Sequence, residues 1–315
     1  MVGNPKLSAR KVLVAEIETS YGVDIITSDP GAAHGILGSN FSFAPMAATV
    51  SKRQRAHALF GADPVEITQK HATLGVDVEM GGAGVPGDPP LYGALLRCCG
   101  LEETLTATVN AMYTPLTDDT ESTSLHFNQD GLQQRLTGCR GTASLKIAGG
   151  ALPLWTFAIQ GLWNAATDAA LPDVHADLEA FLDAAEVNVA NTTCSLFGID
   201  VVLDTLTVDV GNTVMFRDRP NAAYVAITDR SASGSITFEA DAIATYDWES
   251  AAAAKTTGAL ALVQGTEAGN EVSIAAPRVQ LGNPTYADQS GILCVTIPLY
   301  FLRTDGDDEL TFTIR

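Results

Sequence analysis

Apolar and polar residues alternate in two separate stretches of the chain, residues 72–80 and residues 235–240. Alternation with a period of two predicts a β-strand that buries one face and exposes the other. The positions predicted to be buried are Val76, Val78, Ile236 and Phe238. The opposite face carries acidic side chains, namely Asp77, Glu79 and Glu239.

Each predicted strand is followed by the same kinds of segment. A helix of about three turns is predicted at residues 88–100, where prolines suit the start and a glycine suits the end. A second helix is predicted at residues 246–258, which contain an alanine run ended by glycine. Segments typical of paired β-strands come next, at residues 122–161 and 259–302.

This recurrence predicts an internal duplication, which in turn favours a ring or a stack. The first unit is placed at residues 1–162 and the second at residues 194–315, with a linker at residues 163–193. The linker is compatible with a short helix or with an extended surface segment. The alternative to duplication is one domain whose halves resemble each other by coincidence.

Composition narrows the possible functions. The chain has 18 basic and 37 acidic residues, a formal charge of −19, and so acidic a surface repels nucleic acid phosphates. Five cysteines, two of them adjacent, indicate no disulfide framework and fit folding in a reducing cytoplasm. The longest apolar run, residues 292–302, is shorter than the ~20 residues of a membrane helix. No signal peptide is recognisable, and no membrane partner is expected.

Motifs that could carry chemistry are few. Residues 82–87 match the glycine pattern of a dinucleotide site, but Asp88 and two prolines intervene before the helix, so a surface loop is the preferred interpretation. Residues 305–309 are rich in carboxylates but lack the spacing of a calcium loop, and a solvated hairpin tip is predicted instead. Cys139 could be activated by the adjacent Arg140, although a small buried residue is the more common case. The sequence thus predicts no enzyme, no cofactor and no metal site.

Several segments, in order, resemble the long tail tube (major tail) proteins of tailed bacteriophages with non-contractile tails. The resemblance extends over nearly the whole chain and rests on the order and spacing of its motifs. These are residues 11–22, residues 90–100, the Asp130-Gly131 turn leading to residues 138–141, residues 269–280, residues 298–300 and residues 307–312.

The resemblance implies a mainly β fold with a few helices. Two tandem half-barrel units, each with one packed helix, would join neighbouring subunits into a closed inner β-barrel. Asp77, Glu79, Thr237 and Glu239 would then face the lumen, where an acidic wall lets double-stranded DNA pass without binding. The protein would be a virion component, assembled in the host cytoplasm, with the tape measure, tail terminator and distal tail proteins as partners.

Duplication also predicts stoichiometry and contacts. Three chains would supply six units per ring, whereas single-unit members of the family form hexamers, which remain the alternative. Two long excursions from the strands, residues 35–70 and 211–230, are candidates for contacts between stacked rings. Their basic residues could dock on carboxylates of the next ring, or simply belong to a solvated face. The candidates are Lys52, Arg53 and Arg55 in the first excursion and Arg217, Arg219 and Arg230 in the second.

A different functional class remains open at this stage. A secreted-type β-sandwich that binds carbohydrate, or a glycosidase, would also be β-rich and acidic. Binding modules usually gather exposed aromatic residues in one region, whereas Trp155, Trp163 and Trp248 are dispersed here. Catalytic carboxylates pair in space, so their absence cannot be read from the sequence.

Overall fold

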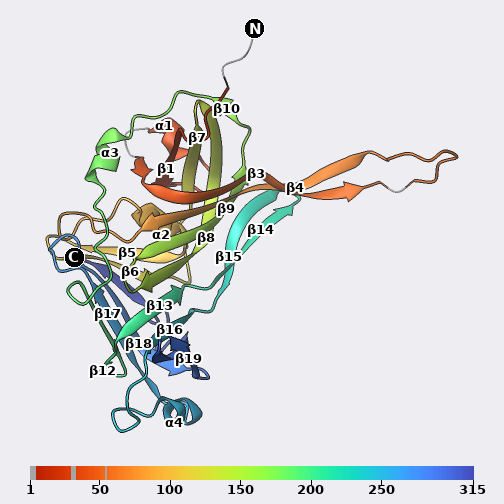
Figure 1. Ribbon diagram of the computed structural model, residues 1–315. Helices are drawn as coiled ribbons and strands as arrows, with labels where there is room; N and C mark the ends of the chain where they lie inside the picture. The colour runs from red at the N-terminus through yellow and green to blue at the C-terminus, as the bar shows by residue number, and fades with distance from the viewer. Residues whose placement is uncertain (1–4, 30–32, 54) are drawn as a thin grey trace.

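The computed structural model describes residues 5–29, 33–53 and 55–315. This part of the chain is built mainly from β-strands, with four short helices (Figure 1). The predicted fold class, mainly β with a few helices, is confirmed at this level.

Eight strands of the main sheet lie side by side, each antiparallel to its neighbours. Their order is β3 (Gly38–Lys52), β4 (Val65–Glu79), β9 (Leu154–Trp163), β8 (Leu132–Ala148), β13 (Leu203–Asp209), β16 (Ser233–Glu239), β20 (Ile292–Phe301) and β19 (Thr285–Gln289). We call this series the eight-strand sheet. Its first four strands come from the first half of the chain and its last four from the second. The β8–β13 pairing joins the two halves.

The strand order of the first half recurs in the second. β3 leads into β4 through a long hairpin, and β13 leads into β16 through the hairpin of β14 (Asn212–Arg219) and β15 (Ala222–Arg230). A short helix follows in both halves, α2 (Gly93–Cys98) after β4 and α4 (Trp248–Ala253) after β16. Later in each half a strand returns to pair with the one before the helix, β9 with β4 and β20 with β16.

The remaining strands branch from the eight-strand sheet. On one side, β2 (His34–Ile36) pairs with β1 (Lys11–Ile17), β1 with β7 (Thr123–Gln129), and both β7 and β10 (Thr167–Asp168) with β8. The other branch runs in the order β12 (Ile199–Asp200), β11 (Thr192–Leu196), β17 (Thr257–Gln264), β18 (Val272–Leu281), β21 (Thr311–Ile314), β6 (Asn110–Pro115) and β5 (Leu101–Thr106). The pairing of β21 with β6 ties the two halves together a second time.

The helices are shorter than the sequence predicts. α2 and α4 have six residues each, so the expectation of about three turns is wrong. The two prolines at 89 and 90 precede α2 in non-helical backbone, and Gly100 at φ +72° closes the segment. α1 (Ile25–Ser28) is a single turn. In the linker, α3 (His175–Ala180) is the short helix, and residues 181–187 after it form no regular element and bury Ala184 and Val187.

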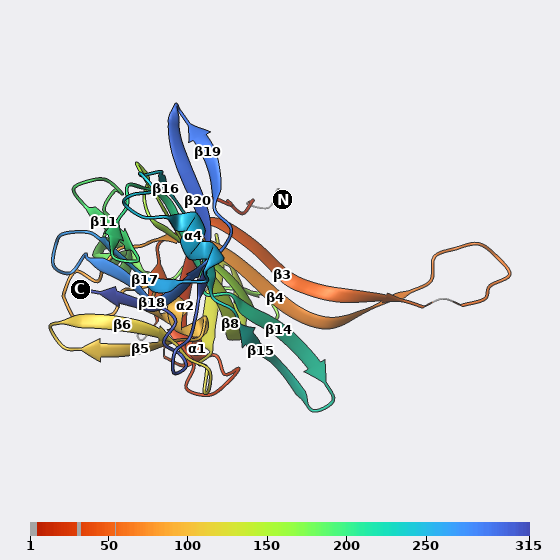
Figure 2. The same cartoon turned by 90° about the horizontal axis from the view of Figure 1, so that it is seen from below.

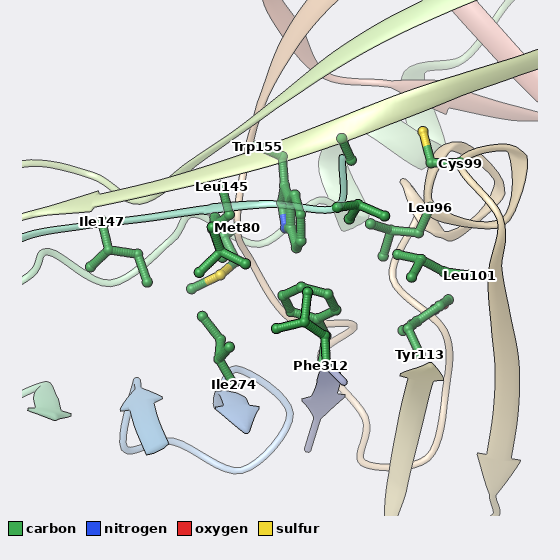
Figure 3. Close-up of a cluster of buried hydrophobic side chains, with 14 of the residues drawn as sticks. Met80, Leu96, Cys99, Leu101, Tyr113, Leu145, Ile147, Trp155, Ile274 and Phe312 are labelled. Atoms are coloured by element: carbon green, nitrogen blue, oxygen red, sulfur yellow. The ribbon is translucent and has the colours of Figure 1, made fainter. Parts of the chain in front are cut away.

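The core lies between the eight-strand sheet and the strands of the second branch (Figure 3). Trp155 of β9 meets Phe312 of β21 edge to face, with ring centroids 5.0 Å apart. Because these residues belong to different halves, one continuous core spans both. The alternating positions predicted to be buried, Val76, Val78, Ile236 and Phe238, are at most 1% exposed, which confirms their orientation.

Candidate assembly surfaces

The face of the eight-strand sheet opposite the core carries rows of small polar side chains. In one row, successive partners across five strands are Asp77, Thr156, Ser144, Asp209 and Ser233. A second row contains Thr205, Thr237, Thr296 and Thr285. A third contains Glu79, Leu154, Lys146, Thr207 and Ser235. We call this surface the hydroxyl face, because threonine and serine outnumber every other residue type in the three rows.

Hydrogen bonds within the hydroxyl face hold its side chains close to the sheet. The hydroxyls of Thr237 and Thr296 lie 2.9 Å apart. Asp77 accepts hydrogen bonds from the hydroxyl of Thr156 at 2.7 Å and from the side-chain amide of Asn40 at 2.8 Å. These two hydrogen bonds hold the Asp77 side chain in one orientation along the surface.

The three acidic residues predicted from the sequence do not all have the same surroundings. Asp77 lies within the hydroxyl face. Glu79 lies at the end of β4, and its carboxylate is 3.4 Å from the backbone nitrogen of Ala184 in the linker. Glu239 ends β16 and is exposed. Together with Asp209, these three residues make four acidic side chains in the rows or at their ends. The single basic residue of the rows is Lys146.

Among the hydroxyl residues of these rows, the sequence pointed to Thr237 alone and missed the others. The segment Leu203–Asp209 alternates in the same way as residues 72–80, with Leu206 and Val208 buried and threonine between them. This alternation indicates that Thr205 and Thr207 lie on the face opposite the core. The rows themselves became visible only with the strand register, because their members come from seven strands.

Both long excursions are β-hairpins that extend from the body (Figures 1 and 2). We call residues 45–70 of the β3–β4 hairpin the first arm, and residues 212–230, the β14–β15 hairpin, the second arm. Lys52 ends β3 in the first arm, and Arg53 forms an ion pair with Glu66 of β4. The backbone N–H of Arg55 donates to Asp63 at 3.1 Å. All three residues are exposed.

The basic residues of the second arm fall into two groups. Arg217 and Arg219 are exposed near its tip. Arg230, at its base, is 12% exposed and forms ion pairs with Asp307 and with Glu309, the latter at 2.6 Å. Arg230 is therefore engaged within the chain, unlike the other two.

The same ion pairs correct the prediction for residues 305–309. This segment is not a solvated hairpin tip, because Asp307 and Glu309 clamp Arg230 and Glu309 is buried. Burial opposes ionisation of Asp307, but hydrogen bonds from Thr117 and Arg230 outweigh it and lower the pKa of the carboxyl.

The glycine-rich loop has a packing role. Gly84 donates its N–H to Gly269 at 2.9 Å, and Gly82 donates to the side chain of Asn270 at 2.7 Å. A Cβ atom at Gly82 would lie 1.9 Å from the carbonyl oxygen of Gly269. The two halves thus approach backbone to backbone here, which only glycine allows.

The Cys139 thiol is not activated. It is fully buried, and burial raises its pKa well above the ordinary value, the reverse of what a nucleophile needs. In the described ranges, no three histidine, cysteine or carboxylate side chains form a group that could hold a metal ion. Within the same ranges, no helix is both long and apolar enough to cross a membrane.

The fold and surfaces define a β-rich protein with two projecting arms. A family model described as phage tail tube protein matches residues 8–299 of the chain. The chain therefore belongs to the phage tail tube protein family, and it is a structural component of the virion. A search of curated proteins found no match.

Proposed function

We propose that this chain polymerises into stacked rings that form the wall of a phage tail tube, through which DNA leaves the virion. The observation that carries the proposal is the eight-strand sheet, in which two consecutive sets of four strands repeat one order and share one polar face. Each set would be one tube unit, residues 1–162 and 194–315, with residues 163–193 linking them. Three chains would then close a ring of six units around the hydroxyl face.

The chemistry of the hydroxyl face suits a DNA conduit. Threonine and serine carry no charge, and the four acidic residues outnumber Lys146 by three charges. A wall of this composition has a net negative charge, so its acidic groups outweigh Lys146 and it repels phosphates weakly along the path. In this role Asp77, Glu79 and Glu239 keep the DNA from adhering.

The arms would make the contacts between rings. The basic cluster Lys52, Arg53 and Arg55 would dock on carboxylates of the adjacent ring, and Arg217 and Arg219 would assist from the second arm. The tape measure protein would occupy the lumen, and the tail terminator and distal tail proteins would bind the two ends of the tube. Membership of a structural family favours this function over a carbohydrate-binding module or glycosidase.

Cryo-electron microscopy of tubes assembled from the full chain tests the stoichiometry. The expected ring contains three chains with approximate six-fold symmetry and the hydroxyl face inward. Six chains per ring, or the hydroxyl face turned away from the lumen, would overturn the proposal.

The role of the lumen is tested by charge reversal. Tubes carrying Asp77→Lys and Glu239→Lys should retain double-stranded DNA at low salt, whereas wild-type tubes should not. Glu179→Lys on α3, outside the eight-strand sheet, is the control and should behave as wild type. Equal DNA retention by all three tubes would remove the support for an acidic lumen.

A further inference from the structure

Each end of the eight-strand sheet is a strand with an unpaired edge. Within the described chain, β3 pairs with β4 only and β19 pairs with β20 only. We infer that β19 of one chain pairs antiparallel with β3 of the next chain, in a register copied from the β8–β13 pairing inside the chain. This inference rests on the proposed ring, but it specifies residues that the ring alone does not.

The strand β19 pairs with β20 in the same way as the end of β8 pairs with β9. Thr285 and Tyr286 pair with Thr296 and Val295 of β20. Ser144 and Leu145 pair with Thr156 and Trp155 of β9. Thr156 and Thr296 in turn occupy equivalent places, since they pair with Asp77 and Thr237, the matching positions of β4 and β16. Tyr286 is therefore the counterpart of Leu145, and Ala287 that of Lys146.

The strand β3 is likewise the counterpart of β13. Gly38 pairs with Val78, and Leu203 pairs with Phe238. Both strands then have an irregularity of one extra residue, between Ser39 and Ser42 in β3 and between Leu203 and Thr205 in β13. The irregularity of β3 lies one residue pair further along than that of β13, but each adds one residue, so the two strands are again aligned beyond both.

Past the bulge, the partners of the two strands match one for one. Ser42 pairs with Gly75, three residues before Val78, and Thr207 pairs with Ser235, three residues before Phe238. Ser42 is therefore the counterpart of Thr207, and Phe43 is the counterpart of Val208.

The internal junction supplies the register. In it, Val208 pairs with Leu145 and Thr207 pairs with Lys146. Substituting the counterparts gives Phe43 opposite Tyr286 and Ser42 opposite Ala287 in the contact between chains. This junction would extend the sheet through the same hydrogen-bond pattern that joins the halves of one chain.

The side chains at these positions suit the contact. Val208 and Leu145 are both 1% exposed in the internal junction, so this position faces the core. Phe43 already packs on Phe127, with ring centroids 5.1 Å apart, whereas Tyr286 is 48% exposed. Pairing β19 with β3 would bring the Tyr286 ring onto Phe43 as a cross-strand aromatic pair, which stabilises antiparallel sheets.

The test is a disulfide between chains in assembled tubes. The double variant Ser42→Cys/Ala287→Cys places two cysteines directly opposite in the inferred register, within disulfide reach. Oxidation should give covalent dimers and trimers on a denaturing gel. The variants are made in a Cys294→Ser background, because Cys294 is paired with Ala287 across β19 and β20 and would compete for the new cysteine within one chain. The other four native cysteines are buried and should contribute little background. The control Ser42→Cys/Gln289→Cys shifts one cysteine two residues along β19, beyond about 7 Å, and should not cross-link.

The outcomes test the register of the β19–β3 pairing independently of the proposed function. Cross-linking in the control alone overturns the register, and tubes in which neither pair cross-links overturn the pairing while leaving the proposed function intact. Failure of the wild-type chain to form tubes would instead count against the proposed function.

Single substitutions at Tyr286 test the same inference if the double cysteine variant fails to assemble. Tyr286→Ser should raise the protein concentration needed for assembly about tenfold or more, and Tyr286→Phe should restore it. Tyr300→Ser is the matched control, because Tyr300 is 50% exposed but belongs to the interior strand β20. Assembly of Tyr286→Ser at the wild-type concentration would overturn the inference.

Discussion

The two arms occupy the same place in the strand order, yet only one of them is anchored to the body. No described residue of the first arm is buried, and its apolar side chains Val50, Leu59 and Ile67 are 55%, 84% and 45% exposed. In the second arm, Val225 is fully buried. Its backbone N–H donates to the hydroxyl of Tyr21 at 2.6 Å, and its carbonyl accepts from Arg140 at 2.8 Å.

This contrast suggests different roles for the two arms. The second arm is stabilised inside its own chain by Arg230 at its base and by Tyr21 and Arg140 along its length. The first arm exposes apolar and basic side chains with little internal support, as expected of a surface that is completed by another molecule. We therefore expect changes in the first arm to affect assembly, and changes at the base of the second arm to affect stability.

The largest effect is expected from reversing the charge of the first arm. The triple variant Lys52→Glu, Arg53→Glu and Arg55→Glu should abolish tube elongation in electron micrographs. Its unfolding free energy should change by no more than about 0.5 kcal/mol, because all three side chains are exposed. Normal tubes from this variant would refute a role for the cluster in stacking.

A charge swap tests whether the triple variant acts through the contact between rings or through loss of the ion pair between Arg53 and Glu66 inside the arm. Arg53→Glu combined with Glu66→Lys restores the opposite charges across the hairpin. We expect this pair, placed in the background of Lys52→Glu and Arg55→Glu, to leave elongation blocked. Recovery of elongation would show that the triple variant acts by disturbing the arm itself.

Arg230→Ala should destabilise the chain by about 3 kcal/mol, because it leaves the buried carboxylate of Glu309 without its partner. Chemical denaturation followed by tryptophan fluorescence measures this change. Arg217→Ala, in the same arm but exposed, is the matched control and should cost less than about 0.5 kcal/mol. Similar losses for both variants would contradict the assignment of Arg230 as the anchor of the second arm.

These differences between the arms show what the sequence could and could not predict. Alternation identified β4 and β16 and the burial of Val76 and Phe238, because period two constrains a strand wherever its partners lie. Both excursions were recognised from their length. Their anchoring was not, since Arg230 meets residues 77 and 79 positions away along the chain.

The extent of the hydroxyl face and the length of the helices could not be predicted from the sequence, for local reasons. Threonine and serine suit strands, turns and caps alike, so the pairing of Thr237 with Thr296 was evident only once their strands were in register. The sequence predicts α2 too long, because Pro89 and Pro90 suit the first turn of a helix but lie before the helix itself. Alternation identified the acidic residues. It could not reveal the contact of Glu79 with Ala184 of the linker, because the two residues are 105 positions apart in the chain.

Tyr21→Phe should have an intermediate effect on the second arm. It removes the hydroxyl that accepts from the Val225 N–H and leaves that group buried without an acceptor, which costs about 1–2 kcal/mol. Tyr224→Phe is the control, because the Tyr224 hydroxyl has no hydrogen-bond partner in the described part of the chain. Denaturation midpoints that shift equally for the two variants would contradict the role of Tyr21.

The smallest expected effect is a dependence of stability on pH. Against the opposing effect of burial, hydrogen bonds from Thr117 and Arg230 lower the pKa of Asp307 in the folded chain, relative to about 3.9 in the unfolded chain. A depressed pKa contributes stability that is present above the unfolded value and is lost as pH falls through the folded value. The stability gap between the wild type and Asp307→Asn should therefore be full at pH 6 and shrink steadily below pH 4. Asp305→Asn, an exposed neighbour, should show a small gap at every pH. If the Asp307→Asn gap stays constant on acidification, the ionised carboxylate does not contribute to the clamp, and Glu309 alone would hold Arg230 and the second arm.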